Sequence, residues 1–157
     1  CILTPSKKAK EKDVKLLETF WKKIGSKVDI MDAKQHDYIL SITSHIPHLI
    51  AYNILNTSIN IQNKKESSIA KYSAGGIRDI TRIAASNPIM WRDVFIHNKK
   101  NTSEMIDKFI ENLEELKEAI ENENGKKLEE IFTKTKKIRK EIIETGQDVR
   151  KPDFGRK

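Results

Sequence analysis

Residues 72–98 read YSAGGIRDITRIAASNPIMWRDVFIHN, and this stretch differs more than any other from the lysine-rich remainder of the chain. It holds the only Gly-Gly pair, three arginines and an apolar run that a proline opens. A second unusual stretch, TSHIPH, occupies residues 43–48. Both stretches gather cationic and hydrogen-bonding side chains, so we expect them to share one pocket.

The composition favours one helical domain. The chain has 157 residues, 37% of them hydrophobic and 34% charged, with only 6 Gly and 4 Pro to interrupt helices. No apolar run approaches the roughly 18–20 residues that span a bilayer, so we expect no membrane partner. The single cysteine, Cys1, excludes an internal disulfide framework and is typical of a cytoplasmic protein.

The net charge of +7 is unevenly distributed. Residues 1–100 carry 17 basic and 9 acidic side chains, whereas residues 101–157 carry 13 and 14. The basic excess therefore belongs to the part with the two unusual stretches, where it would attract an anionic ligand or a nucleic acid. A lysine-rich surface that reflects composition alone is the alternative.

Periodicity predicts helices along the first hundred residues. The first of them would end in a left-handed cap at Gly25, and residues 27–30 alternate like a short strand or an extended link. A helix capped by Asp32 would be kinked near His45, because Pro47 removes an amide donor. The apolar helix that follows this kink would form the buried centre of the domain. The polar residues 57–68 would form a loop.

Further helices are predicted from residues 86–88, where Ser-Asn-Pro resembles a helix start, and from residues 101–104. Apolar stripes on both sides of Asn124-Gly125 predict an antiparallel helical hairpin. The tail from Gly146 onward is expected to be disordered. The fold class is therefore all-α, with a long C-terminal helical hairpin.

His45 and His48 are spaced to share one helix face, and three roles stay open. Zinc sites use this spacing, but neither an H-E-x-x-H pattern nor a cysteine cluster accompanies the pair, so we expect no metal. The pair could instead donate hydrogen bonds to an anionic or hydroxylated ligand, helped by Thr43 and Ser44. It could also be buried and bonded to helix neighbours.

Arg78 and Arg82 lie one helical turn apart, directly after Gly75-Gly76. If a helix begins near Gly76, its free amides favour an anion, and an arginine there can grip a carboxylate with two hydrogen bonds. Asp79 could orient Arg82 from one turn away. The alternative is a surface ion pair worth under about 1 kcal/mol.

Other residues carry weaker signals. Trp91 belongs more often to a core or an interface than to a ligand platform, and Tyr72 is equally ambiguous. The chain contains neither G-x-G-x-x-G nor a P-loop sequence, so it shows no nucleotide-binding fingerprint of its own.

Four motifs in this order resemble the C-terminal domain of the prephenate dehydrogenase family: HDY at 36–38, TSHIPH at 43–48, GGIRDITRIA at 75–84 and SNPIMWRD at 86–93. The resemblance begins at residue 2 and reaches about residue 143. It implies a helical dimerisation domain of the 6-phosphogluconate-dehydrogenase-like C-terminal type over residues 1–145, with residues 146–157 as a tail. It also implies an N-terminal NAD- or NADP-binding Rossmann domain outside this chain, and a homodimer.

The activity that the resemblance implies is oxidative decarboxylation of prephenate to 4-hydroxyphenylpyruvate in tyrosine biosynthesis. Arogenate dehydrogenase, of the same family, is the alternative. By this resemblance Arg82 binds a substrate carboxylate, and His48 and Ser44 contact the substrate. The supporting residues would be His45, Asp79, Gly75, Gly76 and Trp91.

The family's catalytic histidine precedes the point where this chain begins, so we expect no catalytic residue here. None of the four histidines, His36, His45, His48 and His97, is expected to replace it, and we expect this chain alone to be inactive. Two other functions compete with a dehydrogenase: a basic all-α nucleic-acid-binding module, and a dimerisation domain without ligand contacts.

Overall fold

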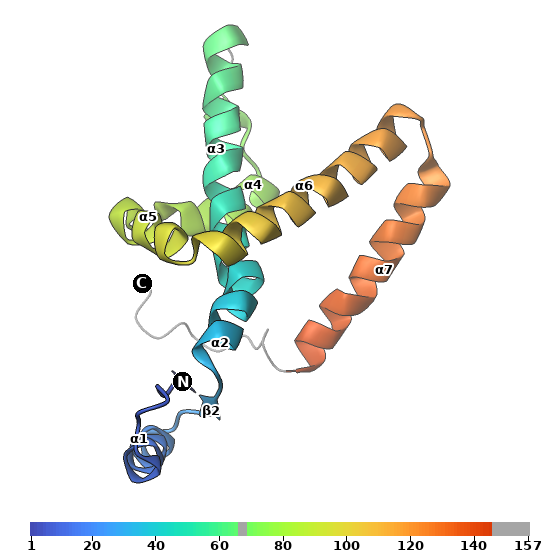
Figure 1. The fold of residues 1–157 in the computed structure, drawn as a ribbon. Helices are drawn as coiled ribbons and strands as arrows, with labels where there is room; N and C mark the ends of the chain where they lie inside the picture. Colours follow the sequence, from blue (N-terminus) through green and yellow to red (C-terminus); the bar gives the residue numbers. More distant parts are fainter. Residues whose placement is uncertain (66–68, 146–157) are drawn as a thin grey trace. The chain divides into compact units, whose positions relative to one another are not determined.

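The computed structural model describes residues 1–65 and 69–145, and most of them lie in helices (Figure 1). The chain divides into two units, residues 1–107 and residues 108–157. The first unit contains both unusual stretches of the sequence. The second contains the later part of one long helix and the whole of the next. The all-α expectation is confirmed, apart from two very short strands.

These strands flank the first helix. β1 (Ile2–Leu3) pairs in parallel with β2 (Asp29–Ile30), and α1 (Glu11–Lys23) connects them. Gly25 closes α1 with a φ of 91°, a conformation that costs a side-chain-bearing residue more than glycine. Both the glycine cap and the short strand follow the sequence prediction.

A wide helical turn joins α2 (Ala33–Leu40) to α3 (Ile46–Lys65). Asp32 caps α2 by accepting a hydrogen bond from the amide of Lys34 at 2.9 Å. The turn is a π-helix, η1 (Ser41–His45), in which the Ile46 amide bonds to the Ser41 carbonyl. Because Pro47 cannot donate a regular helical hydrogen bond, the predicted break near His45 takes the form of this wide turn.

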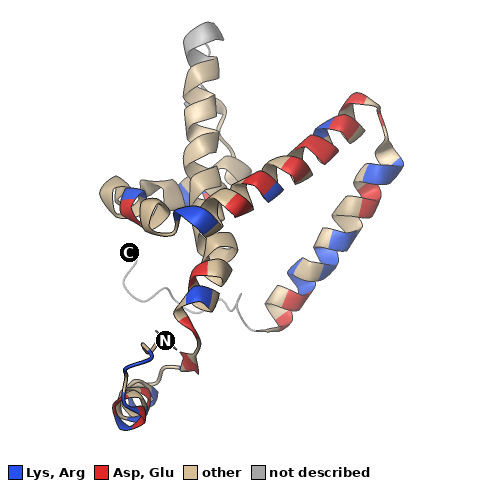
Figure 2. Ribbon diagram, in the orientation of Figure 1, with Lys and Arg blue, Asp and Glu red and all other residues tan. Residues whose placement is uncertain are grey.

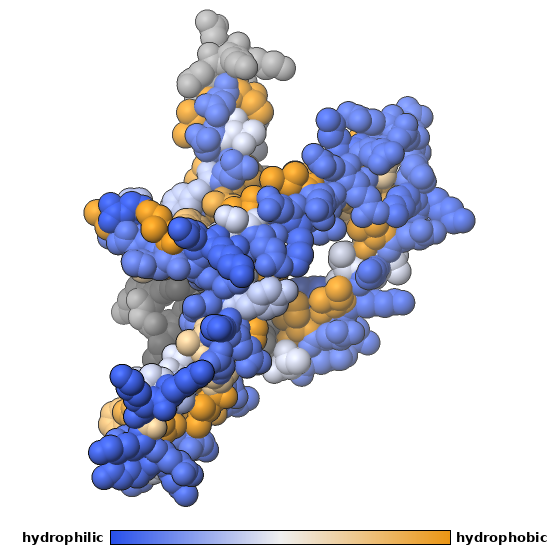
Figure 3. Space-filling model, viewed as in Figure 1, coloured by the Kyte–Doolittle hydropathy of each residue, from blue (hydrophilic) through white to orange (hydrophobic). Residues whose placement is uncertain are grey.

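Helix α3 corrects two predictions. Residues 57–65 are helical instead of forming a loop, while residues 66–68 lie outside the described part. The Asn, Ser and Thr residues within 57–65 favour loops intrinsically. A helix that packing has already nucleated can nevertheless extend through such residues. Only the first half of α3 is a buried centre, because Ile46 and Ala51 are buried whereas Ile59 is 56% exposed. Figure 3 shows apolar side chains on this exposed length.

The stretch at residues 72–98 folds as a series of short helices after η2 (Ile69–Tyr72). They are α4 (Gly75–Thr81), the 3-10 helix η3 (Arg82–Ala85) and α5 (Pro88–His97). Asn87 caps α5 by accepting hydrogen bonds from the amides of Ile89 and Met90 at 2.9 and 3.2 Å, which confirms the predicted start. The Tyr52 hydroxyl on α3 donates to the Ser86 carbonyl at 2.9 Å, so this turn is tied to the central helix.

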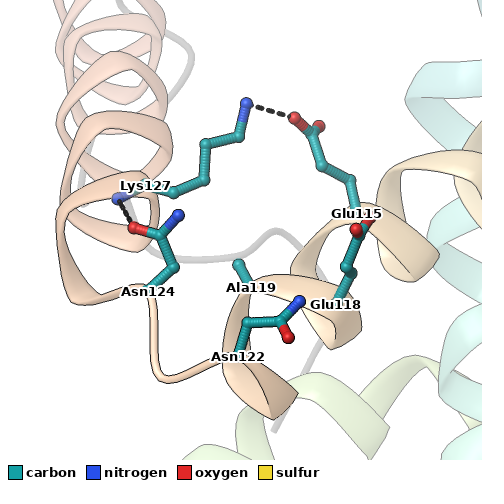
Figure 4. Close-up of a pocket in the computed structure, with 6 residues that line it drawn as sticks. All are labelled: Glu115, Glu118, Ala119, Asn122, Asn124 and Lys127. Atoms are coloured by element: carbon teal, nitrogen blue, oxygen red, sulfur yellow. Dashed lines mark hydrogen bonds and ion pairs between the residues drawn. The ribbon is translucent and has the colours of Figure 1, made fainter.

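Helices α6 (Lys99–Glu121) and α7 (Gly125–Glu144) form the predicted hairpin. α6 begins at Lys99, two residues before the predicted start. Asn124 caps α7 through the Lys127 amide at 3.1 Å, and the Lys127 amine reaches Glu115 at 2.6 Å, as Figure 4 shows. Beyond this turn α7 diverges from the later part of α6 (Figure 1), so the hairpin is open and not closely packed.

The core of the first unit is small. Its buried apolar side chains are Ile46, Ala51, Trp91 and Met105, and the buried polar ones are Ser41, His45 and Thr102. They come from η1, the first half of α3, the middle of α5 and the start of α6. Within the described residues, no helix combines the length and the apolar character needed to cross a membrane.

The hydrogen bond from Tyr52 to Ser86 gives a test of this packing. We expect Tyr52→Phe to lower the free energy of unfolding by about 1 kcal/mol, because it leaves the Ser86 carbonyl without this partner. Urea denaturation measures the change. Tyr38→Phe is the matched control, because Tyr38 is 47% exposed and should lose little. Equal effects of the two substitutions would contradict the role of this bond.

Candidate functional site

The imidazole of His48 stacks on the indole of Trp91, and this pair is the centre of the candidate site. The ring centroids lie 3.6 Å apart and the ring planes differ by 23°. His48 comes from α3 and Trp91 from α5, so the stack joins the two unusual stretches of the sequence. Trp91 is only 7% exposed, so it belongs to the core. Its contact with His48 also places it beside a predicted ligand-binding residue.

One hydrogen bond fixes the state of the His48 ring. Its Nδ1 lies 2.9 Å from the carbonyl oxygen of Ser44. A carbonyl oxygen can only accept, so Nδ1 carries the proton and, in the neutral ring, Nε2 keeps a free lone pair. The contribution of Ser44 is therefore a main-chain atom in the wide turn, and its predicted side-chain contact with a ligand stays a prediction.

His45 is buried next to Trp91, with 8% of its surface exposed. Its ring meets Trp91 and Phe95 edge to face, at centroid distances of 6.2 and 6.3 Å. Burial lowers the pKa of His45 below its ordinary value, and electrostatic interaction with nearby His36 and His48 acts in the same direction. The Asp37 carboxylate opposes them by raising the pKa of His45, but burial is the larger effect.

The buried indole nitrogen Nε1 of Trp91 has no hydrogen-bond partner within the described residues. A buried donor without a partner costs free energy, so native proteins seldom leave one unsatisfied. The hydroxyl of Thr102 on α6 is also buried without a hydrogen-bond partner among the described residues. The ring that stacks on His48 thus carries a buried donor without a partner among the described residues.

Arg82 begins η3, which packs against α3, the helix that carries His48. Its side chain is exposed. The Asp79 carboxylate lies 3.9 Å from the Nε atom of Arg78, and this contact is loose and exposed. The expected support of Arg82 by Asp79 stays a prediction. Helix α4 does begin at the Gly75-Gly76 pair, as predicted.

The two glycines have ample space. A side chain at Gly75 would meet only an Arg78 nitrogen at 3.9 Å, and one at Gly76 would meet nothing within 4 Å. Packing within the described chain therefore does not require glycine at either position. Their predicted supporting role accordingly rests on the family resemblance alone.

The sequence prediction missed Asn98 and Phe95. Phe95 lies one helical turn after Trp91, so the apolar face of α5 could have identified it. Asn98 follows the last residue of α5 and carries no motif, yet its amide contacts both α2 and η1. Such a contact links residues 53 or more positions apart, which local patterns do not reveal.

The second unit contains a feature of its own. A cavity of about 230 Å³ at the α6–α7 turn is lined by Glu115, Glu118, Ala119, Asn122, Asn124 and Lys127, and Figure 4 shows these side chains. It belongs to the second unit and contains none of the predicted ligand-binding residues. Within residues 1–65 and 69–145, no three His, Cys, Asp or Glu side chains gather as metal ligands would.

Comparison with known proteins identifies a consistent set of relatives. A family model described as "Prephenate dehydrogenase, dimerization domain" matches residues 32–134. The chain is 36% identical over 149 residues to the cyclohexadienyl dehydrogenase of Zymomonas mobilis, which covers 95% of this chain and 50% of that protein. It is 33% identical over 138 residues to the prephenate dehydrogenase of Bacillus subtilis, covering 88% of this chain and 37% of that protein.

A solved structure agrees with these relatives. The prephenate dehydrogenase of Aquifex aeolicus, crystallised with hydroxyphenyl propionate and NAD+, superposes with a TM-score of 0.84 at 41% sequence identity. The match covers 90% of this chain and 49% of that one. The chain thus spans half or less of the length of these curated relatives and about half of this solved chain.

The lowered pKa of His45 predicts a pH dependence of stability. When the pH falls below 6.5, the ordinary pKa of histidine, His45 binds a proton more readily in the unfolded chain than in the folded one. The free energy of unfolding therefore decreases as the pH falls. We expect His45→Gln to remove this contribution. Urea unfolding between pH 5 and 8 compares the two proteins, and an unchanged acid dependence in the variant would contradict the prediction.

Proposed function

Because the chain belongs to the prephenate dehydrogenase family through the family's dimerization domain, we propose that it is the substrate-binding and dimerising part of an NAD- or NADP-dependent prephenate dehydrogenase. The proposed reaction is oxidative decarboxylation of prephenate to 4-hydroxyphenylpyruvate. The observation that carries the proposal is the His48–Trp91 stack, which lies within the matched residues and joins two of the motifs.

The described residues do not fit a dinucleotide. The sequence has no glycine-rich loop between a buried strand and a helix, and the Gly75-Gly76 pair opens a helix of only seven residues. We therefore assign no step of the hydride transfer to this chain. NAD or NADP would accept the hydride elsewhere, and the role of these residues is to bind and orient the substrate.

Prephenate carries two carboxylates, and the first unit offers matching partners. Arg82, exposed at the start of η3, is proposed to bind one carboxylate through its guanidinium fork. His48, with its ring plane fixed by Trp91, is proposed to contact the substrate through Nε2, and Ser44 through its hydroxyl. The excess of basic residues among residues 1–100 would attract such a dianion over a distance.

The open hairpin supports self-association with a second copy of this chain. α7 exposes a stripe of apolar side chains, and the later part of α6 exposes another; their exposed fractions exceed about a third for Phe109, Ile110, Leu113, Ile120, Phe132, Ile138 and Ile142. Apolar surface of this extent is generally covered by a partner in a folded protein. The family model that matches this chain is described as a dimerization domain, so a second copy of the chain is the proposed partner.

Charge favours the same partner. Residues 108–123 carry six glutamates and two lysines, whereas residues 126–140 carry seven basic side chains and two glutamates. Figure 2 shows the acidic residues on α6 and the basic ones on α7. In a two-fold dimer each segment of one copy can face the oppositely charged segment of the other, which fixes the pairing and makes it sensitive to salt.

The role of Arg82 is tested in the intact protein. We expect Arg82→Ala to raise the KM for prephenate about 10- to 100-fold, because a charged hydrogen bond to the substrate is lost. Arg82→Lys should recover only part of this loss, since an ammonium cannot form the bidentate pair. Steady-state kinetics measure the change.

Arg92→Ala is the matched control for this experiment. Arg92 is exposed and paired with Asp93 on α5, so its loss should leave the KM within about twofold of wild type. If Arg82→Ala and Arg92→Ala behave alike, Arg82 does not bind the substrate.

The role of α7 is tested by a charge on its apolar stripe. We expect Phe132→Asp to raise the dimer dissociation constant by roughly tenfold or more, because a carboxylate would be buried without a partner at the interface. Sedimentation equilibrium measures the constant. Thr133→Asp adds the same charge at an exposed position about 100° further around the helix, off the apolar stripe, and should change the constant little; equal weakening by both variants would exclude the stripe as the interface.

A further inference from the structure

Asn98 occupies the joint between α5 and α6. Its amide nitrogen donates to the Val94 carbonyl at 3.1 Å and ends α5, while its carbonyl accepts from the Thr102 amide at 3.0 Å in α6. Its side chain reaches out of both helices. The side-chain nitrogen Nδ2 donates to the Asp37 carbonyl in α2 at 2.7 Å and lies 3.3 Å from Nδ1 of His45.

The neighbours of Asn98 determine which way its side-chain amide is turned. The Asp37 carbonyl oxygen can only accept, so the NH2 group must face it. On the other side, the Asn98 oxygen Oδ1 accepts from the Asn101 side chain at 2.8 Å. One hydrogen of the Asn98 NH2 group points to the Asp37 carbonyl, so the other is available to His45. In that hydrogen bond Nδ1 of His45 is the acceptor.

The two histidines of the site are therefore held in opposite forms. His45 accepts at Nδ1 and keeps its proton on Nε2, whereas His48 donates from Nδ1 to the Ser44 carbonyl and presents Nε2 as an acceptor. A charged His45 would place one N–H group against another at Asn98. The other titratable groups acting on His45 are His36 and Asp37 on α2 and His48 on α3.

We propose that Asn98 is a positioning residue: its amide holds the His45 proton on Nε2 and ties α2 and η1 to the α5–α6 joint, so that the ring flanking Trp91 keeps one form and one orientation. Trp91 in turn supports His48. The link to substrate binding rests on the proposed function, whereas the hydrogen-bond arrangement does not depend on it.

Nuclear magnetic resonance on the chain with ¹⁵N-labelled histidine tests this arrangement without substrate or cofactor. In the wild type we expect a protonated Nε2 and an unprotonated Nδ1 for His45, and the reverse for His48. Asn98→Ala should give His45 a mixture of both forms. Asn98→Asp should move the proton to Nδ1, because a carboxylate can only accept there.

Three results would overturn the proposal: a proton on Nδ1 of wild-type His45, an unchanged His45 signal in Asn98→Ala, or an equal change in the control Asn53→Ala, which removes an exposed amide from α3. If Asn98→Ala does not fold, Asn101→Ala gives a milder test. It removes only the partner of the Asn98 oxygen, and it should shift His45 part of the way towards the mixture.

Kinetics on the intact protein test the positioning step. Asn98→Ala should raise the KM for prephenate about three- to tenfold with a smaller change in kcat, since it loosens the support of a binding residue. An altered His45 form with an unchanged KM would overturn the positioning role. Failure of the proposed function is distinguishable, because Arg82→Ala would then leave the KM unchanged while the His45 signals keep the expected form.

Discussion

Pro47 imposes the constraint on which the site depends. It cannot donate a main-chain hydrogen bond, so the helix that begins at Ala33 cannot continue regularly through this position. The chain responds with the π-helical turn at Ser41–His45, after which α3 starts anew. The wide turn buries His45 and brings the Ser44 carbonyl to His48, so one missing amide accounts for the placement of both histidines. Wide turns of this kind are common at functional sites.

Local signals predicted the places where the main chain must change direction. Gly25, the Asn87-Pro88 pair and Asn124 mark helix ends through their own conformational preferences, which need no knowledge of the rest of the fold. The prediction failed at residues 57–65 because polar composition resembles a loop, whereas extension of an established helix decided the outcome. Propensity is weak compared with packing.

The site was predictable only in part, for a similar reason. The motifs pointed to His48 and Trp91 separately, but their stacking joins residues 43 positions apart and depends on how α3 and α5 pack. Asn98 was invisible because it matches no motif and acts through the fold. The small core adds a further limit: much of the apolar surface is exposed in this chain, so the pattern of hydrophobic residues overstated how much of it one chain can bury.

The hydrogen bond that orients His48 has a consequence for how this family can vary. Its acceptor is the main-chain carbonyl at position 44, an atom that every amino acid supplies. Replacing the serine side chain therefore need not disturb the histidine behind it. Mutation can explore this position at little structural risk, and under the proposed substrate contact of Ser44 such changes would alter ligand preference while the architecture around it stays constant.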